Sequence, residues 1–197
     1  MALGYVRPAR PGEAGEIARI QLTTWRVAYR TLLPRRILDD LDPDWLAGRW
    51  REAIVSPPSP RHRVLIAIEQ ADSDAAAPAH PVGFLAAGPT DEAALAPAEA
   101  PLDPATVAAV TDLLVEPRWG RRGHGSRLLA AGVAGWRADG FRTAVAWAYD
   151  RDPATRTFLA AAGWEPDGAV RALDVDDLLV AQLRLHVDLR AVPTARD

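Results

Sequence analysis

Two kinds of apolar pattern alternate along the chain. Short apolar runs predict β-strands, and longer segments whose apolar residues recur at helical spacing predict α-helices. The predicted strands are 5–7, 63–69, 82–88, 106–115, 142–149, 169–174 and 180–189. The predicted helices are 11–30, 35–39, 45–54, 126–138 and 153–162. This order predicts a mixed α/β fold, in which helices flank one sheet.

Turn residues mark where several helices begin and end. Asp42 and Asp152 each stand before a proline, which is the arrangement of an N-cap residue followed by Pro at the first helical position. Gly140 and Gly163 follow the ends of the two later helices, where glycine commonly adopts a left-handed conformation.

The last strand alternates between apolar and polar residues. We expect one set to point inward, namely Ala181, Leu183, Leu185, Val187 and Leu189, and the other outward, namely Gln182, Arg184, His186 and Asp188. Two segments rich in Ala and Pro predict loops. The first, 71–81, is expected to be mobile, and the second, 89–104, is expected to overhang a site because it precedes the central strand.

Composition predicts one soluble domain over 1–197, with a core from about 4 to 190. Apolar residues make up 49% and charged residues 25%, as in globular proteins. The absence of cysteine excludes disulfides, thiolate metal sites and cysteine nucleophiles, and we predict no metal site. Neither a signal peptide nor a membrane-spanning segment is expected, so a cytoplasmic location is predicted.

The charges indicate a small anionic ligand rather than a polyanion. All 23 basic residues other than histidine are arginines, and the net charge is −3, which argues against a nucleic-acid partner or a basic membrane-binding surface. Several arginines nevertheless gather near 118–127, on a mildly acidic chain.

The segment 115–130 has the layout of a phosphate-binding turn. The strand 106–115 ends at Glu116-Pro117, and a turn rich in Gly and Arg leads into the next helix. Glycines allow the backbone to approach an anion, and the first N–H groups of the helix point toward it. We therefore predict a diphosphate site formed by the backbone of 121–126 and by the side chains of Arg121 and Arg122.

Two common nucleotide motifs fit this turn poorly. A dinucleotide motif needs a third glycine, but Leu128 occupies that position. A mononucleotide P-loop needs a lysine, and the chain contains none.

The turn instead resembles the coenzyme A motif of the GCN5-related N-acetyltransferase (GNAT) superfamily, [QR]-x-x-G-x-[GA], matched over 120–125. Gly123 and Gly125 fit its two small positions, whereas Gly120 replaces the basic or amide residue. A second family motif, N-x-x-A-R-x-F-Y followed by G-F or G-W, is similar to 152–159 and Gly163-Trp164. The order of the predicted elements matches the family over nearly the whole chain.

The resemblance implies a single N-acetyltransferase domain with a mostly antiparallel sheet of six to seven strands and about four helices. The fourth and fifth strands would be splayed around the pantetheine arm of acetyl-coenzyme A, the cosubstrate. The residues expected to bind it are Leu114, Val115, Arg121, Arg122, Gly123, His124, Gly125, Ser126, Asp152 and Arg156. A backbone N–H near Leu114 and Val115 would bind the thioester oxygen.

The implied reaction is acyl transfer to a primary amine by direct attack, which requires a general base. Asp112 is the preferred candidate, Glu116 the second, and a solvated strand carboxylate is the alternative interpretation of Asp112. Tyr149 is expected to lend a hydroxyl group. Leu159 replaces a tyrosine that serves as general acid in many family members, and Asp152 replaces an asparagine.

Trp25 and Tyr29 lie four residues apart on the first long helix and are candidates for binding the acceptor, with core packing as the alternative. A small-molecule amine is the predicted acceptor, but the sequence does not identify it, and an antibiotic, a polyamine, an amino acid and a protein N-terminus all remain open. A catalytically weak acyl-coenzyme A binding module is the alternative function. A homodimer is possible, with the last strand pairing across the subunits.

Overall fold

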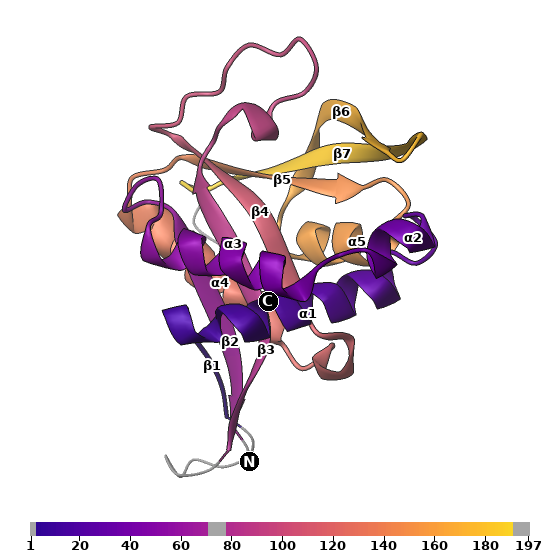
Figure 1. Cartoon of the computed structure of the whole chain (residues 1–197). Helices are drawn as coiled ribbons and strands as arrows, with labels where there is room; N and C mark the ends of the chain where they lie inside the picture. The colour runs from indigo at the N-terminus through magenta and orange to yellow at the C-terminus, as the bar shows by residue number, and fades with distance from the viewer. Residues whose placement is uncertain (1–2, 71–77, 191–197) are drawn as a thin grey trace.

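The computed structural model describes residues 3–70 and 78–190 of the chain. Its seven strands form one sheet in the order β1-β2-β3-β4-β5-β7-β6 (Figure 1). The strands are β1 (Leu3–Pro8), β2 (Arg63–Gln70), β3 (Ala79–Pro89), β4 (Val107–Val115), β5 (Thr143–Tyr149), β6 (Glu165–Val175) and β7 (Leu178–Asp188). Neighbouring strands are antiparallel except β4 and β5, which are parallel. The predicted mixed, mostly antiparallel sheet is confirmed.

Helices cover both faces of this sheet. The described residues form five α-helices, as the apolar pattern predicts and one more than the resemblance implies: α1 (Ala14–Ala28), α2 (Arg35–Asp39), α3 (Pro43–Val55), α4 (His124–Ala138) and α5 (Pro153–Ala161). On one face α1 and α3 pack against a cluster that includes Ile66, Phe84 and Leu114. On the other face α4 and α5 supply Leu128, Leu129, Trp136 and Leu159 to the larger core (Figure 1). The sheet therefore separates two differently lined compartments.

The predicted caps form as expected. The Asp42 side chain accepts a hydrogen bond from the Asp44 amide (2.8 Å) at the start of α3. Asp152 accepts from the amides of Ala154 and Thr155, both at 3.1 Å, at the start of α5. Gly140 and Gly163 have φ of +82° and +83° after α4 and α5, a conformation that costs glycine little.

Several predicted boundaries change. The helix α4 begins at His124 instead of 126, because Gly123 takes a left-handed conformation (φ +79°) and acts as its N-cap. The strand β3 begins at Ala79, inside the predicted loop 71–81, of which 71–77 lies outside the described residues. The strand β6 begins at Glu165, before the predicted 169. The loop 89–104 contains one turn of 3₁₀ helix, η2 (Glu92–Ala94).

The strand β4 contains a bulge that decides which way its later side chains point. Asp112 lies opposite Ala86 of β3, whereas Val110 lies opposite Ala87, so Thr111 is the extra residue. The Thr111 hydroxyl donates to the Ala86 carbonyl at 3.1 Å. Because the bulge precedes Asp112 and Glu116, these two residues share one face, as expected.

The prediction for the last strand is wrong in two respects. Gln182 and Arg184 are buried and Ala181 is exposed, because the loop 89–104 covers the face of β7 that was expected to meet solvent. The strand β7 also lies between β5 and β6, so it is not free to pair with another subunit. The edge strand at this end is β6, and a homodimer stays a prediction.

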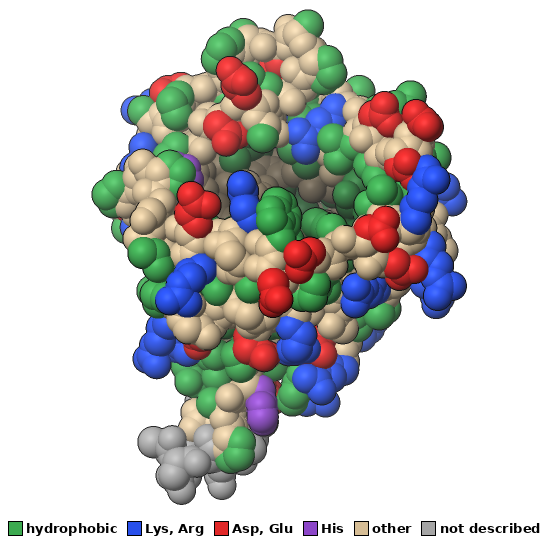
Figure 2. Space-filling view, in the orientation of Figure 1, with side chains coloured by type: hydrophobic (Ala, Val, Ile, Leu, Met, Phe, Trp, Pro, Cys, Tyr) green, Lys and Arg blue, Asp and Glu red, His purple; other side chains and the backbone are tan. Residues whose placement is uncertain are grey.

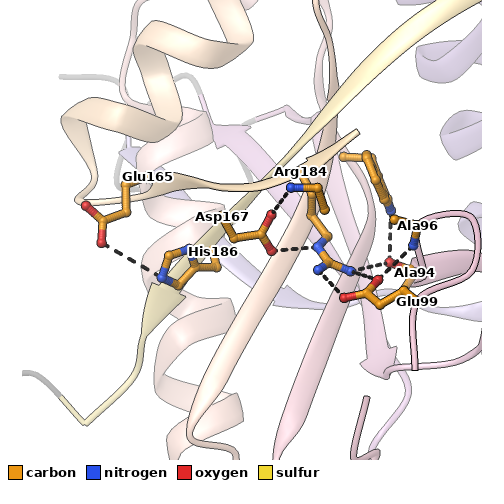
Figure 3. Close-up of polar contacts among 9 residues, drawn as sticks. Ala94, Ala96, Glu99, Glu165, Asp167, Arg184 and His186 are labelled. Atoms are coloured by element: carbon orange, nitrogen blue, oxygen red, sulfur yellow. Dashed lines mark hydrogen bonds and ion pairs between the residues drawn. The ribbon is translucent and has the colours of Figure 1, made fainter. Parts of the chain in front are cut away.

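A buried arginine joins this loop to the sheet (Figure 3). The Arg184 guanidinium, 4% exposed, pairs with Glu99 of the loop at 2.6 Å and with Asp167 of β6 at 2.7 Å. It also donates to the Ala94 carbonyl at 3.0 Å. The hydrogen bond from Arg184 lowers the pKa of Glu99. The loop is therefore fixed onto β7 by one cation shared between two carboxylates.

We predict that Arg184→Ala destabilises the protein by about 2–3 kcal/mol in urea unfolding. Loss of one partner of a buried ion pair typically costs about 3–5 kcal/mol, and both carboxylates here keep some contact with water. The matched control is Arg190→Ala, which removes an exposed arginine–aspartate pair and should change the free energy of unfolding by less than about 1 kcal/mol. Equal effects of the two variants would show that burial adds nothing to the Arg184 pair.

Candidate functional site

The site lies where β4 and β5 separate. These parallel strands pair from Val107 with Thr143 to Val110 with Ala146 and no further, although β4 continues to Val115 and β5 to Tyr149. The gap between their carboxyl ends confirms the predicted splay. It also leaves backbone polar groups on both sides without a ladder partner in the neighbouring strand.

Two adjoining cavities occupy this region. The first, which we call the cradle cavity, measures about 340 Å³ and is bounded by the turn 120–126, Trp119 and the first residues of α5. The second, which we call the central cavity, measures about 160 Å³ and lies in the gap itself. Both are lined by Leu113, Thr155 and Phe158, so they lie side by side and together make up the cleft.

The central cavity reaches both faces of the sheet. Trp25 and Tyr29 line it from the side of α1, whereas Leu129, Phe158 and Leu159 line it from the side of α4 and α5. The face that carries α1 and α3 is hollowed in the space-filling view, with acidic and basic side chains around the opening (Figure 2). A molecule entering from this face could meet one bound along α4 without leaving the protein.

The cradle is the N-terminus of α4. Gly123 caps the helix through its left-handed backbone, and no side chain caps the first turn. The amides of His124, Gly125 and Ser126 therefore keep their hydrogen-bonding capacity for a ligand. A Cβ at Gly125 would lie 3.3 Å from the Phe158 ring, so this glycine keeps the cleft open between α4 and α5.

The two arginines of the turn point in different directions. Arg121 lines the cradle cavity and has a left-handed backbone (φ +61°). Arg122 does not line either cavity; its guanidinium lies 4.9 Å from the centroid of the Trp119 ring and 3.7 Å from Glu69. The structure therefore places one of the two predicted cations, Arg121, at the cleft.

His124 supports the turn from behind. Its ring is 1% exposed, with Nε2 3.1 Å from a Glu69 carboxylate oxygen and Nδ1 3.1 Å from an Arg127 guanidinium nitrogen. Burial lowers the pKa of His124, which favours the neutral ring. Its side chain is engaged inside the protein, so its amide is the part available to a ligand.

Strand geometry indicates which amides face the gap. The Glu116 amide donates to the Val82 carbonyl at 2.8 Å, toward β3. The amides of consecutive residues point to opposite edges of a strand. Since the Glu116 amide points toward β3, the amides of Val115 and Leu113 face the gap. This alternation favours Leu113 and Val115 over the predicted Leu114, whose side chain packs beneath α1 and α3.

The carboxylates near the gap differ in their surroundings. Asp112 is half-buried and lines the central cavity, and burial raises its pKa to about 6. Glu116, 4% exposed, instead pairs with Arg118 at 2.7 Å and with Arg19 at 3.1 Å, and it lines neither cavity. Asp112 is thus the β4 carboxylate that a reacting group can reach.

Aromatic rings enclose the central cavity around Asp112. The Tyr29 and Tyr149 rings meet edge to face, with centroids 4.9 Å apart, and the Trp25 ring lies 6.4 Å from Tyr29. Burial raises the pKa of both tyrosines, and the Asp112 charge adds to the effect. Both phenols therefore keep their protons at neutral pH.

The two residues predicted on α5 have separate positions. Asp152 lines the central cavity, but its carboxylate is occupied by the cap of α5 and by the Thr155 hydroxyl at 2.6 Å. Arg156 lines neither cavity and donates to the Asp150 carbonyl at 3.1 Å. Its guanidinium thus stabilises the turn before α5.

Comparison with known proteins agrees with this geometry. The family model described as the acetyltransferase (GNAT) family matches residues 21–164, which include β4, the cradle and α5. The chain belongs to the GNAT family of acetyltransferases. A search of curated proteins finds no significant match.

Solved structures share the GNAT fold at low sequence identity. An N-acetyltransferase from Staphylococcus aureus Mu50 is 14% identical with a TM-score of 0.68, over 95% of this chain and 99% of that one. A proposed GNAT acetyltransferase from Desulfovibrio desulfuricans is 19% identical with a TM-score of 0.64, over 95% and 99%. A proposed acetyltransferase from Salmonella typhimurium, solved with its cofactor acetyl-CoA, is 15% identical with a TM-score of 0.62, over 98% and 99%.

Sequence reasoning missed several residues of this GNAT cleft. Leu113, Thr155 and Phe158 line both cavities, and Trp147 and Gln182 line the central one. Thr155 and Phe158 stand three residues apart on α5, a spacing that could have indicated a shared face.

No helix in 3–70 or 78–190 is long and apolar enough to cross a membrane.

We predict that Gly125→Glu weakens coenzyme A binding by about a hundredfold or more, as measured by calorimetry. The new carboxylate would lie in the cradle, where like charges repel strongly in a partly desolvated cleft. The backbone of Gly125 is helical, so the substitution needs no left-handed conformation, unlike one at Gly123. The control is Ala130→Glu, on the exposed side of α4, and a comparable loss there would contradict the assignment.

We also predict different effects for the two arginines of the turn. Arg121→Asn should weaken coenzyme A about tenfold, as expected for one charged hydrogen bond, and leave pantetheine, which lacks the diphosphate, unchanged. Asparagine tolerates the left-handed backbone at this position. Arg122→Asn should change the affinity for either ligand by less than about twofold, and the reverse order would show that Arg122 faces the diphosphate.

Proposed function

We propose that the protein is an N-acetyltransferase that moves an acetyl group from acetyl-coenzyme A to the primary amine of a small molecule by direct attack. The observation that carries this proposal is the pair of adjoining cavities at the gap between β4 and β5. At one end lies an anion-binding helix N-terminus, and at the other lies a carboxylate with a pKa of about 6. The acetylated amine and free coenzyme A would be the products.

The residues present fit coenzyme A. The amides of α4 and the Arg121 side chain suit the diphosphate, and the space kept open between Gly125 and Phe158 suits an extended pantetheine arm. The amides of Leu113 and Val115 that face the gap are placed to bind the thioester oxygen. Donors of this kind typically contribute about 3–4 kcal/mol when negative charge develops on that oxygen.

Asp112 is the proposed general base. At neutral pH a carboxyl group with a pKa of about 6 is mostly ionised, yet basic enough to accept a proton from an ammonium group, directly or through water. The neutral amine would then attack the thioester carbonyl, forming the C–N bond. Collapse of the tetrahedral intermediate would break the C–S bond and release the thiolate. The attacking nitrogen would lose its second proton at this stage, which balances the proton that the thiolate takes up.

The leaving thiolate has a nearby candidate proton donor. Leu159, 4% exposed, lines the central cavity at the position of the family tyrosine and has no proton to give. Tyr149 lines the same cavity from β5, and its raised pKa keeps the phenol protonated. We therefore assign the general acid role to Tyr149 within this proposal.

The size of the central cavity favours a small acceptor. It measures about 160 Å³ and is enclosed by aromatic rings and by Gln182, so a folded protein surface would not enter it. The alternative function, an acyl-coenzyme A binding module with weak catalysis, is favoured by Leu159 alone.

We predict that Asp112→Asn lowers kcat about a hundredfold with a competent amine, as loss of a general base typically does. The affinity for acetyl-coenzyme A should be unchanged, because Asp112 does not line the cradle cavity. In the wild type, kcat/KM should fall as the pH drops through about 6, where Asp112 takes up a proton. This limb should be missing from the variant, whose activity should rise with pH as more amine becomes neutral.

The comparison variant is Glu116→Gln, which should keep kcat within about threefold because Glu116 does not reach the cleft. A stability measurement separates chemistry from unfolding. Since burial raises the pKa of Asp112 above its unfolded value, the fold loses stability as the pH rises through about 6, and this loss is complete at higher pH. The Asp112→Asn variant should therefore be at least as stable as the wild type at pH 8. An unchanged kcat in this variant would show that Asp112 is not the general base.

A further inference from the structure

Arg171 occupies an unusual position next to the central cavity. It lies on β6 opposite Gln182 of β7, which in turn lies opposite Tyr149 of β5. Directly opposed residues on neighbouring strands project from the same face of the sheet. Because Gln182 and Tyr149 both line the central cavity, this row of three side chains leads from the cavity to Arg171.

Neutral groups hold the guanidinium in place. Its Nε donates to the Gln182 side-chain oxygen at 2.7 Å, and one Nη donates to the Ala93 carbonyl at 2.5 Å. The group also lies over the Trp147 ring, 4.2 Å from its centroid, and Trp147 itself lines the cavity. The orientation of Arg171 is therefore fixed without any carboxylate.

A comparison with Arg184 shows that, among the residues that the structure describes, Arg171 lacks a carboxylate partner. Arg184 lies on the same side of the sheet, near the same Trp147 ring, and pairs with Glu99 and Asp167. Within the described part of the chain, no carboxylate lies within ion-pair distance of Arg171. Burial and the charge of Arg184 lower its pKa, which reflects the cost of this half-buried charge. A charge kept in such surroundings gains most from an anion supplied by a ligand.

We infer that the acceptor is a primary amine that also carries a carboxylate, and that Arg171 binds this carboxylate. The inference rests on the proposed amine acetylation. With its amine near Asp112 and its carboxylate toward Arg171, such a zwitterion would have each charge opposite a charge of the other sign. Arginine suits this task because its planar group presents several donors to a carboxylate.

The test compares amines that differ only in the carboxylate. γ-Aminobutyrate is paired with butylamine and β-alanine with propylamine, since the ammonium groups of each pair are similarly basic. We expect the wild type to prefer the carboxylate-bearing member by about ten- to a hundredfold in kcat/KM, mainly through KM, as for one charged hydrogen bond. Arg171→Gln should reduce this ratio to about one, and Arg171→Lys should keep part of it.

The ratio reports recognition rather than folding, because general damage to the protein slows both members of a pair. The matched control is Arg35→Gln on exposed α2, which should keep the wild-type ratio. Neutral amines used as well as the anionic ones by the wild type would overturn the inference. An unchanged ratio in Arg171→Gln would overturn the assignment to Arg171.

A second measurement separates failure of the inference from failure of the proposed function. If neither class of amine is acetylated, the proposed function fails for these acceptors, and binding alone decides the inference. Butyrate and 1-butanol are titrated by NMR into the coenzyme A-saturated protein. We expect butyrate to bind the wild type at least about tenfold more tightly than 1-butanol and to lose this advantage in Arg171→Gln. Equal binding of the two probes by the wild type would overturn the inference.

Discussion

The rest of the site depends on one constraint, namely that β4 and β5 stop pairing halfway along their length. Parallel strands normally continue their ladder to a common end, and four residue pairs are a short ladder for strands of nine and seven residues. The unpaired halves open a passage between the two faces of the sheet. The other features of the site depend on this opening, since the cradle lies on the side of α4 and α5 and the enclosing aromatic rings come from α1 and β5.

Among the described residues, the charged groups near the passage are of two kinds, those with a partner of opposite charge and those without one. Cations with partners serve the fold, as Arg184 does between Glu99 and Asp167 and Arg19 does beside Glu116. Groups without a compensating charge line the passage or border it, as do the uncapped amides of α4, the half-buried Asp112 and Arg171. The paired cations thus stabilise the fold, and the groups without a compensating charge are the ones that we propose bind ligands.

Short-range sequence patterns were enough to predict most of the fold but only part of the site. Asp152 before Pro153, and Gly163 after α5, act within a few residues of themselves, so their roles could be read from the sequence. Alternation along β7 identified two faces, yet it could not indicate that the loop 89–104 would bury Arg184 and Gln182. Likewise, Arg121 and Arg122 are chemically identical, yet Arg121 has a left-handed backbone and lines the cradle cavity, whereas Arg122 lies against Trp119 and Glu69. Burial by a distant loop and a positive φ angle decide where these side chains lie, and neither can be read from residue type alone.

The bulge at Thr111 makes the site of this chain sensitive to the length of β4. Upstream of it, Val110 packs with the core on the side of α4, whereas downstream Leu114 packs with the cluster beneath α1 and α3. One additional residue therefore shifts the phase of the strand and turns Asp112 toward the acceptor side. The direction of the Asp112 side chain thus depends on the number of residues in β4 as much as on which residues they are. A one-codon deletion there would preserve every chemical group of the site and still present the carboxylate to the wrong compartment.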